Sequence, residues 1–210
     1  MKIAIIQASS QADKNRLLYD AVKSSDVNDE IIDFGCFEDE AVSYSYIEIS
    51  ILIGILLSSK TVDFVVTGCS SGQGMMLACN SMPGVLCGYI PSPKDAYLFA
   101  QINNGNAVSL PLGEDYTYAG EENLKETIQA LFLEPFGQGY PKSEAERKKK
   151  DTCQLKQIRK NSQTDMISLL QSLHEDLLRK VLSRKNVIDH VLQNTDNIDL
   201  IRFISDRKGN

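Results

Sequence analysis

The sequence predicts an α/β fold: a Rossmann-like, three-layer α/β/α arrangement with a five-stranded parallel sheet, followed by a helical C-terminal extension. Two observations lead to this prediction. Over residues 1–142, short apolar runs rich in β-branched residues alternate with helical patterns, which is typical of strands joined by right-handed helical crossovers. From residue 143 to residue 210, charged segments of helical period follow without a strand pattern, so we expect a second, helical unit there.

Five runs have the length and composition of buried strands, namely residues 2–6, 30–34, 62–66, 85–90 and 107–110. Helical patterns fill the intervals, at residues 14–23, 47–57, 75–80, 95–102 and 121–132. Pro83 and Gly84 end the third helix because neither residue continues a helix well. Ligands of parallel sheets bind at the carboxyl ends of the strands, so we expect the functional loops directly after these five strands.

Composition narrows the class of protein. The chain has 210 residues, a formal net charge of -6, a pI of about 5.0 and 42% apolar residues, which fits a globular protein and argues against a nucleic-acid partner. Its five cysteines show neither a disulfide framework nor metal-ligand spacing. The N-terminus lacks the pattern of a signal peptide, and the longest apolar run, residues 47–57, is too short to span a bilayer. We therefore expect a cytoplasmic protein without a membrane segment or a metal site.

The extension carries an apolar stripe at spacings of three and four residues, from Leu169 to Leu182, which continues at Val187 to Leu192. A helical segment with one apolar face must bury that face, either against its own domain or against another subunit. Both alternatives remain open from the sequence. The two histidines, His174 and His190, lie in this segment and are interpreted as structural or solvated rather than as ligands.

The segment at residues 62–80, VDFVVTGCSSGQGMMLACN, reads as a strand, a glycine-rich turn and the start of a helix. Its glycines permit positive φ and close approach of a ligand to the backbone: Gly68, Gly72 and Gly74. The free N–H groups and the dipole of the helix start make this turn a candidate anion site. Cys69, flanked by the hydroxyls of Ser70 and Ser71, is the candidate reactive group.

This turn and its continuation, CSSGQGMMLACNSMPG, together with the later AQINNGNA, resemble the family of type B ribose-5-phosphate isomerases and galactose-6-phosphate isomerases. That family carries a Cys-Gly-Thr-Gly-x-Gly loop, an Ala-Asn-Lys helix end followed by Pro-Gly, and a His-Asn-Asp-x-Asn segment. The alignment needs no gap over residues 46–106 and extends less clearly over residues 1–140. The extension resembles a longer branch of the family that shares TGCxxGQG and AQINNGNA.

The resemblance implies an aldose–ketose isomerase that acts on a phosphorylated sugar through a cis-enediolate, without a metal or an organic cofactor. Cys69 matches the catalytic base of the family, and a helix start stabilises the thiolate form that such a base requires. Ser71 matches the Ser/Thr position beside the base. Tyr46 falls on the tyrosine of an Asp-Tyr-Pro motif that contacts the sugar.

The remaining implied contacts are of two kinds. Backbone N–H groups of the turn would stabilise the enediolate oxygen, and they belong to Ser70, Gly72, Gln73 and Gly74. Asn103 and Asn106 fall on the two asparagines of His-Asn-Asp-x-Asn.

Members of this family form dimers with active sites at the subunit boundary, so a homodimer or tetramer is expected, with a small sugar or sugar phosphate as ligand.

The sequence departs from the family at several positions. The ring-opening histidine would fall at Ile102, which has no proton to transfer. The Asp-His pair with which the family binds the sugar would fall at Ala8 and Ser9. Of these two residues, Ser9 offers a neutral hydrogen-bonding group. The first phosphate-binding arginine site reads GEDY, at residues 113–116, and for the second the nearest cation is Arg147 or Lys148. These changes suggest a substrate that is already open, or one whose ring is opened by another group, and a sugar that differs from ribose 5-phosphate.

Other interpretations remain for the same residues. Cys69 can be a small residue packed in a tight turn, Tyr46 an aromatic residue packed on the sheet, and the asparagines a helix stop. The chain could then be a non-catalytic protein that binds a carbohydrate or metabolite with the isomerase fold. A nucleotide-binding Rossmann protein fits less well, because the turn lacks the spacing of a dinucleotide fingerprint and has no Walker lysine.

If the apolar stripe of the extension packs between subunits, truncation after about residue 150 weakens assembly, because the buried interface is lost. Sedimentation velocity of the truncated and full-length proteins tests this expectation. A truncated protein that sediments as the same oligomer would contradict it.

Overall fold

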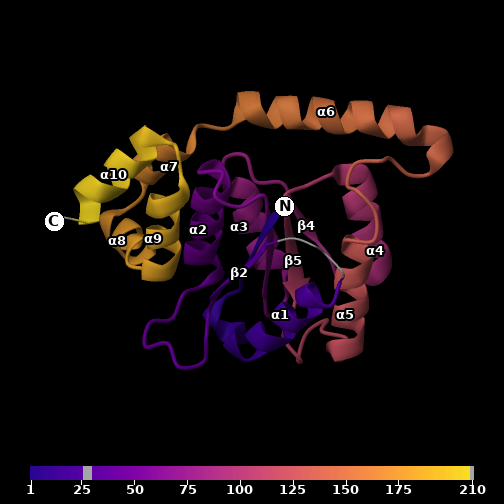
Figure 1. Ribbon diagram of the computed structural model, residues 1–210, viewed down its shortest axis with the longest axis horizontal. Helices are drawn as coiled ribbons and strands as arrows, with labels where there is room; N and C mark the ends of the chain where they lie inside the picture. Colours follow the sequence, from indigo (N-terminus) through magenta and orange to yellow (C-terminus); the bar gives the residue numbers. More distant parts are fainter. Residues whose placement is uncertain (26–29, 209–210) are drawn as a thin grey trace.

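The computed structural model describes residues 1–25 and 30–208, so the last two residues of the expected extension lie outside it. Its centre is one sheet of five parallel strands in the order β2-β1-β3-β5-β4 (Figure 1). The strands are β1 (Lys2–Ile6), β2 (Glu30–Gly35), β3 (Phe64–Cys69), β4 (Cys87–Tyr89) and β5 (Ala107–Pro111). The predicted Rossmann-like α/β class is confirmed.

Helices cover both faces of the sheet because alternate residues of each strand point to opposite sides. One face packs against α2 (Tyr46–Ser58) and α3 (Gln73–Ser81). The other face packs against α1 (Asn15–Lys23), α4 (Pro93–Leu98) and α5 (Gly120–Leu131). Short helical turns complete the domain: η1 (Ser9–Lys14), the π-helical η2 (Phe99–Asn103) and η3 (Lys142–Glu144).

Four strands differ in their bounds from the prediction: β2 and β5 each end one residue later, and β3 and β4 differ more. β3 extends to Cys69, because Cys69 pairs with Pro111 and its carbonyl accepts the N–H of Leu112 at 3.1 Å. β4 is limited to Cys87–Tyr89, at the edge of the sheet, instead of residues 85–90. The difference in β3 bears on the site, since Cys69 is the last residue of a central strand and not part of the turn that follows.

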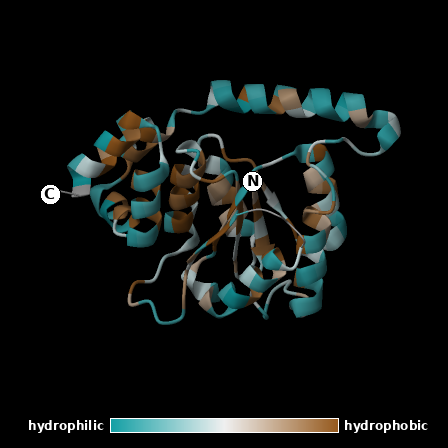
Figure 2. Ribbon diagram, viewed as in Figure 1, coloured by the Kyte–Doolittle hydropathy of each residue, from teal (hydrophilic) through white to brown (hydrophobic). Residues whose placement is uncertain are grey.

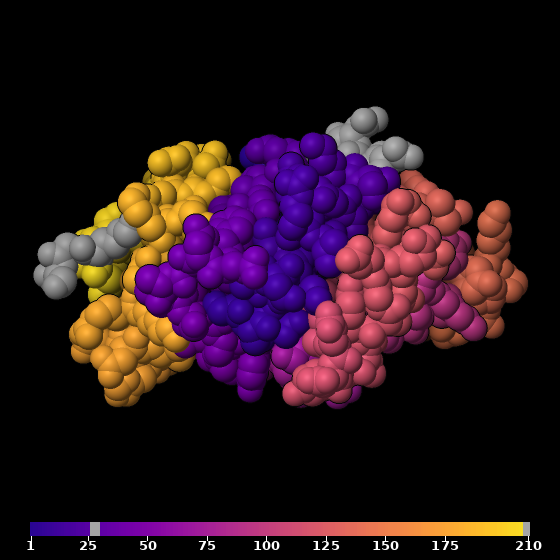
Figure 3. Space-filling view, turned by 90° about the horizontal axis from the view of Figure 1, so that it is seen from below, coloured from indigo at the N-terminus to yellow at the C-terminus, as the bar shows by residue number. Residues whose placement is uncertain are grey.

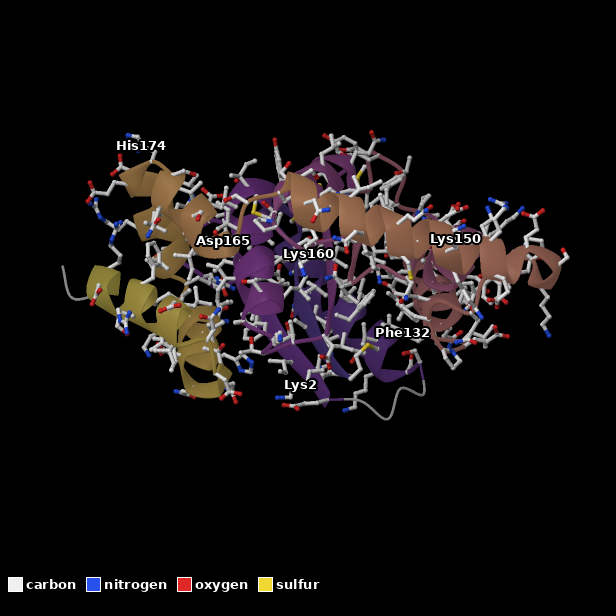
Figure 4. The ribbon with its side chains drawn as sticks, turned by 90° about the horizontal axis from the view of Figure 1, so that it is seen from above. Lys2, Phe132, Lys150, Lys160, Asp165 and His174 are labelled. Atoms are coloured by element: carbon white, nitrogen blue, oxygen red, sulfur yellow. The ribbon has the colours of Figure 1, made fainter. Side chains whose placement is uncertain are left out.

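The extension consists of five helices: α6 (Ala145–Ser162), α7 (Met166–Ser172), α8 (Glu175–Leu182), α9 (Lys185–Asn194) and α10 (Ile198–Lys208). The long α6 has no buried residue and crosses one rim of the sheet domain, whereas α7–α10 pack together beside α2 (Figure 1). From above, Lys150 and Lys160 lie along α6, Asp165 lies where α7 begins, and His174 lies at the outer border of the extension (Figure 4).

α2 carries apolar residues around most of its circumference, which fits its position between the sheet and the extension. Its buried residues run without interruption from Glu48 to Leu56, and they belong to the same apolar core as the buried residues of α7–α10. Figure 2 shows the brown faces of the extension turned toward the brown α2, while α6 is largely teal. Within the described residues, the apolar stripe of α7–α10 is therefore buried in its own chain. None of the helices in residues 1–25 and 30–208 is both long and apolar enough to cross a membrane.

Gly54 permits the close packing of α2 against α7. A Cβ atom at this position would lie 3.1 Å from Met166 Sδ and 3.1 Å from Met82 Cβ. We predict that Gly54→Val lowers the free energy of unfolding by about 1–3 kcal/mol, because the added side chain overfills this contact. Chemical denaturation measures the change.

The exposed Gln129 on α5 offers a matched control, since Gln129→Val also introduces a β-branched residue into a helix but contacts no core. Equal losses of stability in the two variants would contradict the packing argument.

Candidate active site

The candidate site lies at the carboxyl edge of the sheet, where the chain changes direction. β1 pairs with β2 on one side and with β3 on the other, which makes this the switch point at which open α/β sheets bind ligands. Hydrogen bonds tie the loops of neighbouring strands together, from Ala8 N–H to the Gly68 carbonyl at 3.0 Å and from Gly113 N–H to the Ser70 carbonyl at 2.9 Å. The backbone around Cys69 is therefore held from both sides.

A cavity of about 310 Å³ opens at this edge. Four of the five predicted loops contribute to it, and the loop after β4 does not. The lining residues are Ala8, Ser10, Tyr44, Ser45, Tyr46, Cys69, Ser70, Ser71, Gly74 and Tyr116. No charged side chain is present in this lining of described residues, so hydroxyl, thiol and backbone groups make up its polar surface.

Cys69 is set apart from the other cysteines by its position. It is 7% exposed and borders the cavity, whereas Cys79 and Cys87 are buried together in the apolar core. A hydrogen bond with Cys79 and burial raise the pKa of the Cys87 thiol. Burial also raises the pKa of Cys36, although Ser9 and the charge of Arg184 oppose this effect. The thiols of Cys36 and Cys87 are thus kept neutral. Cys69 is the buried cysteine that faces the cavity.

The backbone on either side of Cys69 requires glycine at two positions, Gly68 in β3 and Gly72 in the turn that follows. Gly72 has φ +73° and caps α3, and a Cβ atom there would lie 2.9 Å from the backbone of Leu110 and Pro111. A Cβ atom at Gly68 would lie 2.6 Å from the Leu110 carbonyl oxygen. Ser109 Oγ donates to the Gly72 carbonyl at 2.6 Å and fixes the turn further. As a result, the first N–H groups of α3, which have no partner within the helix, lie beside the cavity.

The opposite wall comes from the start of α2. Ser45 caps this helix, with its hydroxyl accepting the Ile47 N–H and Glu48 accepting the Ser45 N–H at 2.8 Å. Tyr46 is 41% exposed, and its ring faces Gly74, where an added Cβ atom would lie 3.6 Å from the ring carbons. The cavity is thus a gap between the first turns of α2 and α3.

The structure brings together five of the predicted site residues: Tyr46, Cys69, Ser70, Ser71 and Gly74. Gly72 and Gln73 adjoin them in the turn and the first residue of α3. Ser70 Oγ accepts a hydrogen bond from Gln11 Nε2 at 3.1 Å. Ser9 lies next to the cavity but is engaged with Tyr44, since its Oγ accepts the Tyr44 N–H at 2.8 Å and its N–H donates to the Tyr44 carbonyl at 2.9 Å.

Three other predicted residues do not reach this cavity within one chain. Asn106 precedes β5 at its amino end, where its side chain bonds to Leu86 N–H at 2.8 Å and to the Gly84 carbonyl at 2.9 Å. The length of the strand, ~13 Å, separates that end from the Cys69 end. Asn103 ends η2 on the same side, and Arg147 on α6 is exposed and paired with Glu144 and Asp151.

Several residues that line the cavity were not among the predicted site residues. They are Ala8, Ser10, Tyr44, Ser45 and Tyr116. For Ser45 a signal was available, because Ser-x-x-Glu before an apolar run is the pattern of a capping box and places the helix start. Tyr44 and Tyr116 lie in irregular loops whose paths are set by contacts distant in sequence. No local pattern indicates where such side chains point.

The cation in the η1 turn after β1 is held in ion pairs. Lys14 is 9% exposed and pairs with Glu114 at 2.8 Å and with Asp13 at 3.1 Å. Hydrogen bonds to Glu114 and then to Asp13 raise the pKa of Lys14 above its usual value. The acidic segment at residues 113–116 thus uses Glu114 to hold Lys14, and the site relies on backbone N–H groups for positive potential.

The five-stranded parallel sheet and the comparisons with known proteins together place this chain in the class of sugar isomerases. The chain belongs to the ribose/galactose isomerase family, whose sequence model matches residues 3–151.

Solved structures extend the likeness to the C-terminal helices. A 4-deoxy-L-threo-5-hexosulose-uronate ketol-isomerase, crystallised with a tartrate, is 35% identical, with 100% of each chain covered and a TM-score of 0.93. A ribose-5-phosphate isomerase of Vibrio parahaemolyticus is 32% identical, with 99% of each chain covered and a TM-score of 0.91.

More distant relatives share the fold alone. The type B ribose 5-phosphate isomerase of Trypanosoma cruzi is 23% identical, with 76% of this chain and 98% of that chain covered and a TM-score of 0.63. No match was found among curated proteins. The predicted family membership is thereby confirmed, and this chain is an isomerase by family.

The two glycines of the turn give a direct test of its geometry. Gly72→Ala is predicted to lower the free energy of unfolding by about 1–3 kcal/mol, because alanine is strained at positive φ. Gly74→Ala is predicted to be neutral or stabilising by up to about 1 kcal/mol, because Gly74 is helical and its neighbours leave room for a methyl group.

Thermal and chemical denaturation of both variants measures these changes. If Gly74→Ala were the more damaging substitution, the assignment of Gly72 as the conformationally required residue would be wrong.

Proposed function

We propose that this protein is a cofactor-independent ketol-isomerase that interconverts an aldose and a ketose form of an open-chain sugar carrying an anionic group, such as a sugar phosphate or a sugar acid. The observation that supports this most directly is the cavity in which the Cys69 thiol meets the hydroxyls of Ser70 and Ser71 and the first turn of α3. Family membership supplies the reaction class.

In the proposed reaction the Cys69 thiolate removes the proton from C2 of the aldose, and the electron pair forms the C1–C2 double bond of a cis-enediolate. The negative oxygen at C1 is held by N–H groups at the start of α3. Ser71 relays the hydroxyl proton from O2 to O1, and Cys69 returns its proton to C1, which yields the ketose. The atoms and electrons balance without an external oxidant or reductant.

Two features disfavour the cyclic form of a pentose phosphate as the substrate. The first concerns opening of the ring, and the second concerns binding of the phosphate. Ile102 occupies the position that the resemblance gives to a ring-opening histidine, and its carbonyl accepts the hydroxyl of Thr152 at 2.6 Å, on the side of the domain away from Cys69. The lining also lacks cationic side chains among the described residues. The relative named as a ketol-isomerase acts, by its name, on a hexosulose uronate. A sugar acid therefore stands beside sugar phosphates as a candidate substrate.

We further propose a homodimer or tetramer with the active site at the subunit boundary. Asn103, Asn106 and Arg147 lie far from Cys69 within one chain, so they can contact the same substrate only if a second copy supplies them. A cytoplasmic location is proposed as well, since all five cysteines are free thiols.

A non-catalytic carbohydrate-binding protein is the second candidate. It is favoured by the uncharged lining, which offers hydrogen bonds suited to sugar hydroxyls whether or not Cys69 removes a proton.

The decisive experiment is proton exchange at C2 in deuterated water, followed by NMR over pentoses, hexoses, their phosphates and open-chain uronates. Cys69→Ala is predicted to reduce exchange and turnover by about 100- to 10,000-fold, the usual effect of removing a general base. Cys153→Ser is the matched control, because Cys153 is exposed on α6.

Exchange that persists in Cys69→Ala would reject Cys69 as the base. Binding of a sugar without exchange in the wild-type protein would favour the carbohydrate-binding alternative.

A further inference from the structure

The segment between β2 and α2, residues 36–45, forms one wall of the cavity and is held by the C-terminal extension. Tyr44 lines the cavity and is 4% exposed. Its hydroxyl lies 3.2 Å from Ser183 Oγ, and the cations of Arg184 and Lys180 lie 4.8 Å and 5.7 Å from the centre of its ring. Figure 3 shows the violet segment after β2 directly against the orange and yellow extension.

Arg184 holds the beginning of this segment. It is 5% exposed, its Nη1 donates to Glu40, and its Nη2 donates to the Phe34 carbonyl at 2.6 Å. Asn186 Nδ2 donates to the same carbonyl at 2.9 Å. Because a planar guanidinium reaches both partners at once, the end of β2 and the loop after it are fixed to the junction of α8 and α9.

Lys180 holds the end of the segment. Its ammonium group lies 2.8 Å from Glu48, which is 8% exposed and also accepts the Ser45 N–H of the α2 capping box. Burial alone would raise the pKa of Glu48, but the hydrogen bonds from Lys180 and Ser45 outweigh it and lower the pKa. The charged carboxylate is thus retained, and with it the start of α2 that carries Tyr46.

The backbone of Tyr44 connects the restrained segment to the loop after β1, which lies beside Cys69. Its N–H and carbonyl are both bonded to Ser9, directly after β1, whose loop is in turn bonded to Gly68 of β3 through Ala8 N–H. Lys180 of α8 and Arg184 at the junction of α8 and α9 therefore influence where Tyr44, Ser45 and Tyr46 lie opposite Cys69, although neither cation lines the cavity.

We propose that the C-terminal extension is a working part of the active site of its own chain, in which Arg184 and Lys180 are positioning residues that hold residues 36–45 against the Cys69 cavity. This inference rests on the proposed function for its kinetic consequences. Its structural consequence, the covering of Cys69, is independent of any substrate.

Two measurements test the proposal on the full-length protein. Arg184→Met is predicted to increase the rate of iodoacetamide alkylation of Cys69 by about 10-fold, because the restraint on the covering segment is lost. Peptide mass spectrometry resolves the individual cysteines, and the exposed Cys153 on α6 is the internal reference whose rate stays unchanged. Hydrogen exchange of residues 36–45 increases in parallel.

With the substrate identified by the exchange experiment, Arg184→Met is predicted to lower kcat/KM by about 10- to 100-fold, mainly through kcat, because the substrate is held in poorer geometry. Arg184→Lys is predicted to be intermediate, since an ammonium group can pair with Glu40 but lacks the fork that also reaches Phe34. Arg179→Met is the matched control, because Arg179 lies on α8, shortly before Arg184 in the chain, but pairs with the exposed Glu175 and Asp176.

If Arg184→Met does not fold, Glu40→Gln removes the charge from the loop side of the same pair and leaves α8 intact. Unchanged alkylation and exchange in a folded variant would overturn the proposal. Increased alkylation without turnover of any sugar, even by the wild-type protein, would support the positioning role and reject the isomerase function instead. Equal kinetic losses in Arg179→Met and Arg184→Met would also contradict a specific role for Arg184.

Discussion

The structure depends on the way the carboxyl end of β3 is held between its neighbours. β3 lies between β1 and β5, and the ladder continues through Cys69, which pairs with Pro111. The chain must then turn within three residues to begin α3, and Gly72 allows this turn by adopting positive φ directly against the β5 backbone. A thiol on a central strand is thereby placed beside the first N–H groups of a helix, of which that of Gln73 donates to Ser71 Oγ at 3.4 Å, and this arrangement suits the proposed proton transfer.

α2 connects this site to the extension. Because the helix lies between the sheet and α7–α10, its apolar residues contribute to one continuous core, and its first turn contributes to the cavity. An apolar helix enclosed in this way cannot shift without disturbing packing on both sides. The extension is thus coupled to the catalytic edge through packing as well as through its charged contacts.

The sequence was sufficient to predict the layer order, the five strands and the turn at Cys69, since apolar periodicity and glycine spacing are local properties. It could not decide which partner covers the stripe of α7–α10, because an amphipathic pattern specifies that a face is buried and not by what. The uniform apolarity of α2 was the available indication of a second covering layer. Tyr44 and Arg184 were beyond prediction, since their roles arise from contacts between residues 140 positions apart in the chain.

The charged side chains near the cavity hold parts of the chain in place and do not line the cavity itself. The cations that lie near the cavity are each engaged by carboxylates: Lys14 by Asp13 and Glu114, Lys180 by Glu48, and Arg184 by Glu40. The Arg184–Glu40 pair is largely buried and therefore costly to break, whereas the pairs of Lys14 and Lys180 are partly exposed and weaker. Under the proposed function, the anionic group of the substrate would be met by backbone N–H groups of α3 or by residues of a second chain. The backbone contribution does not titrate, and it is retained whichever sugar the cavity selects.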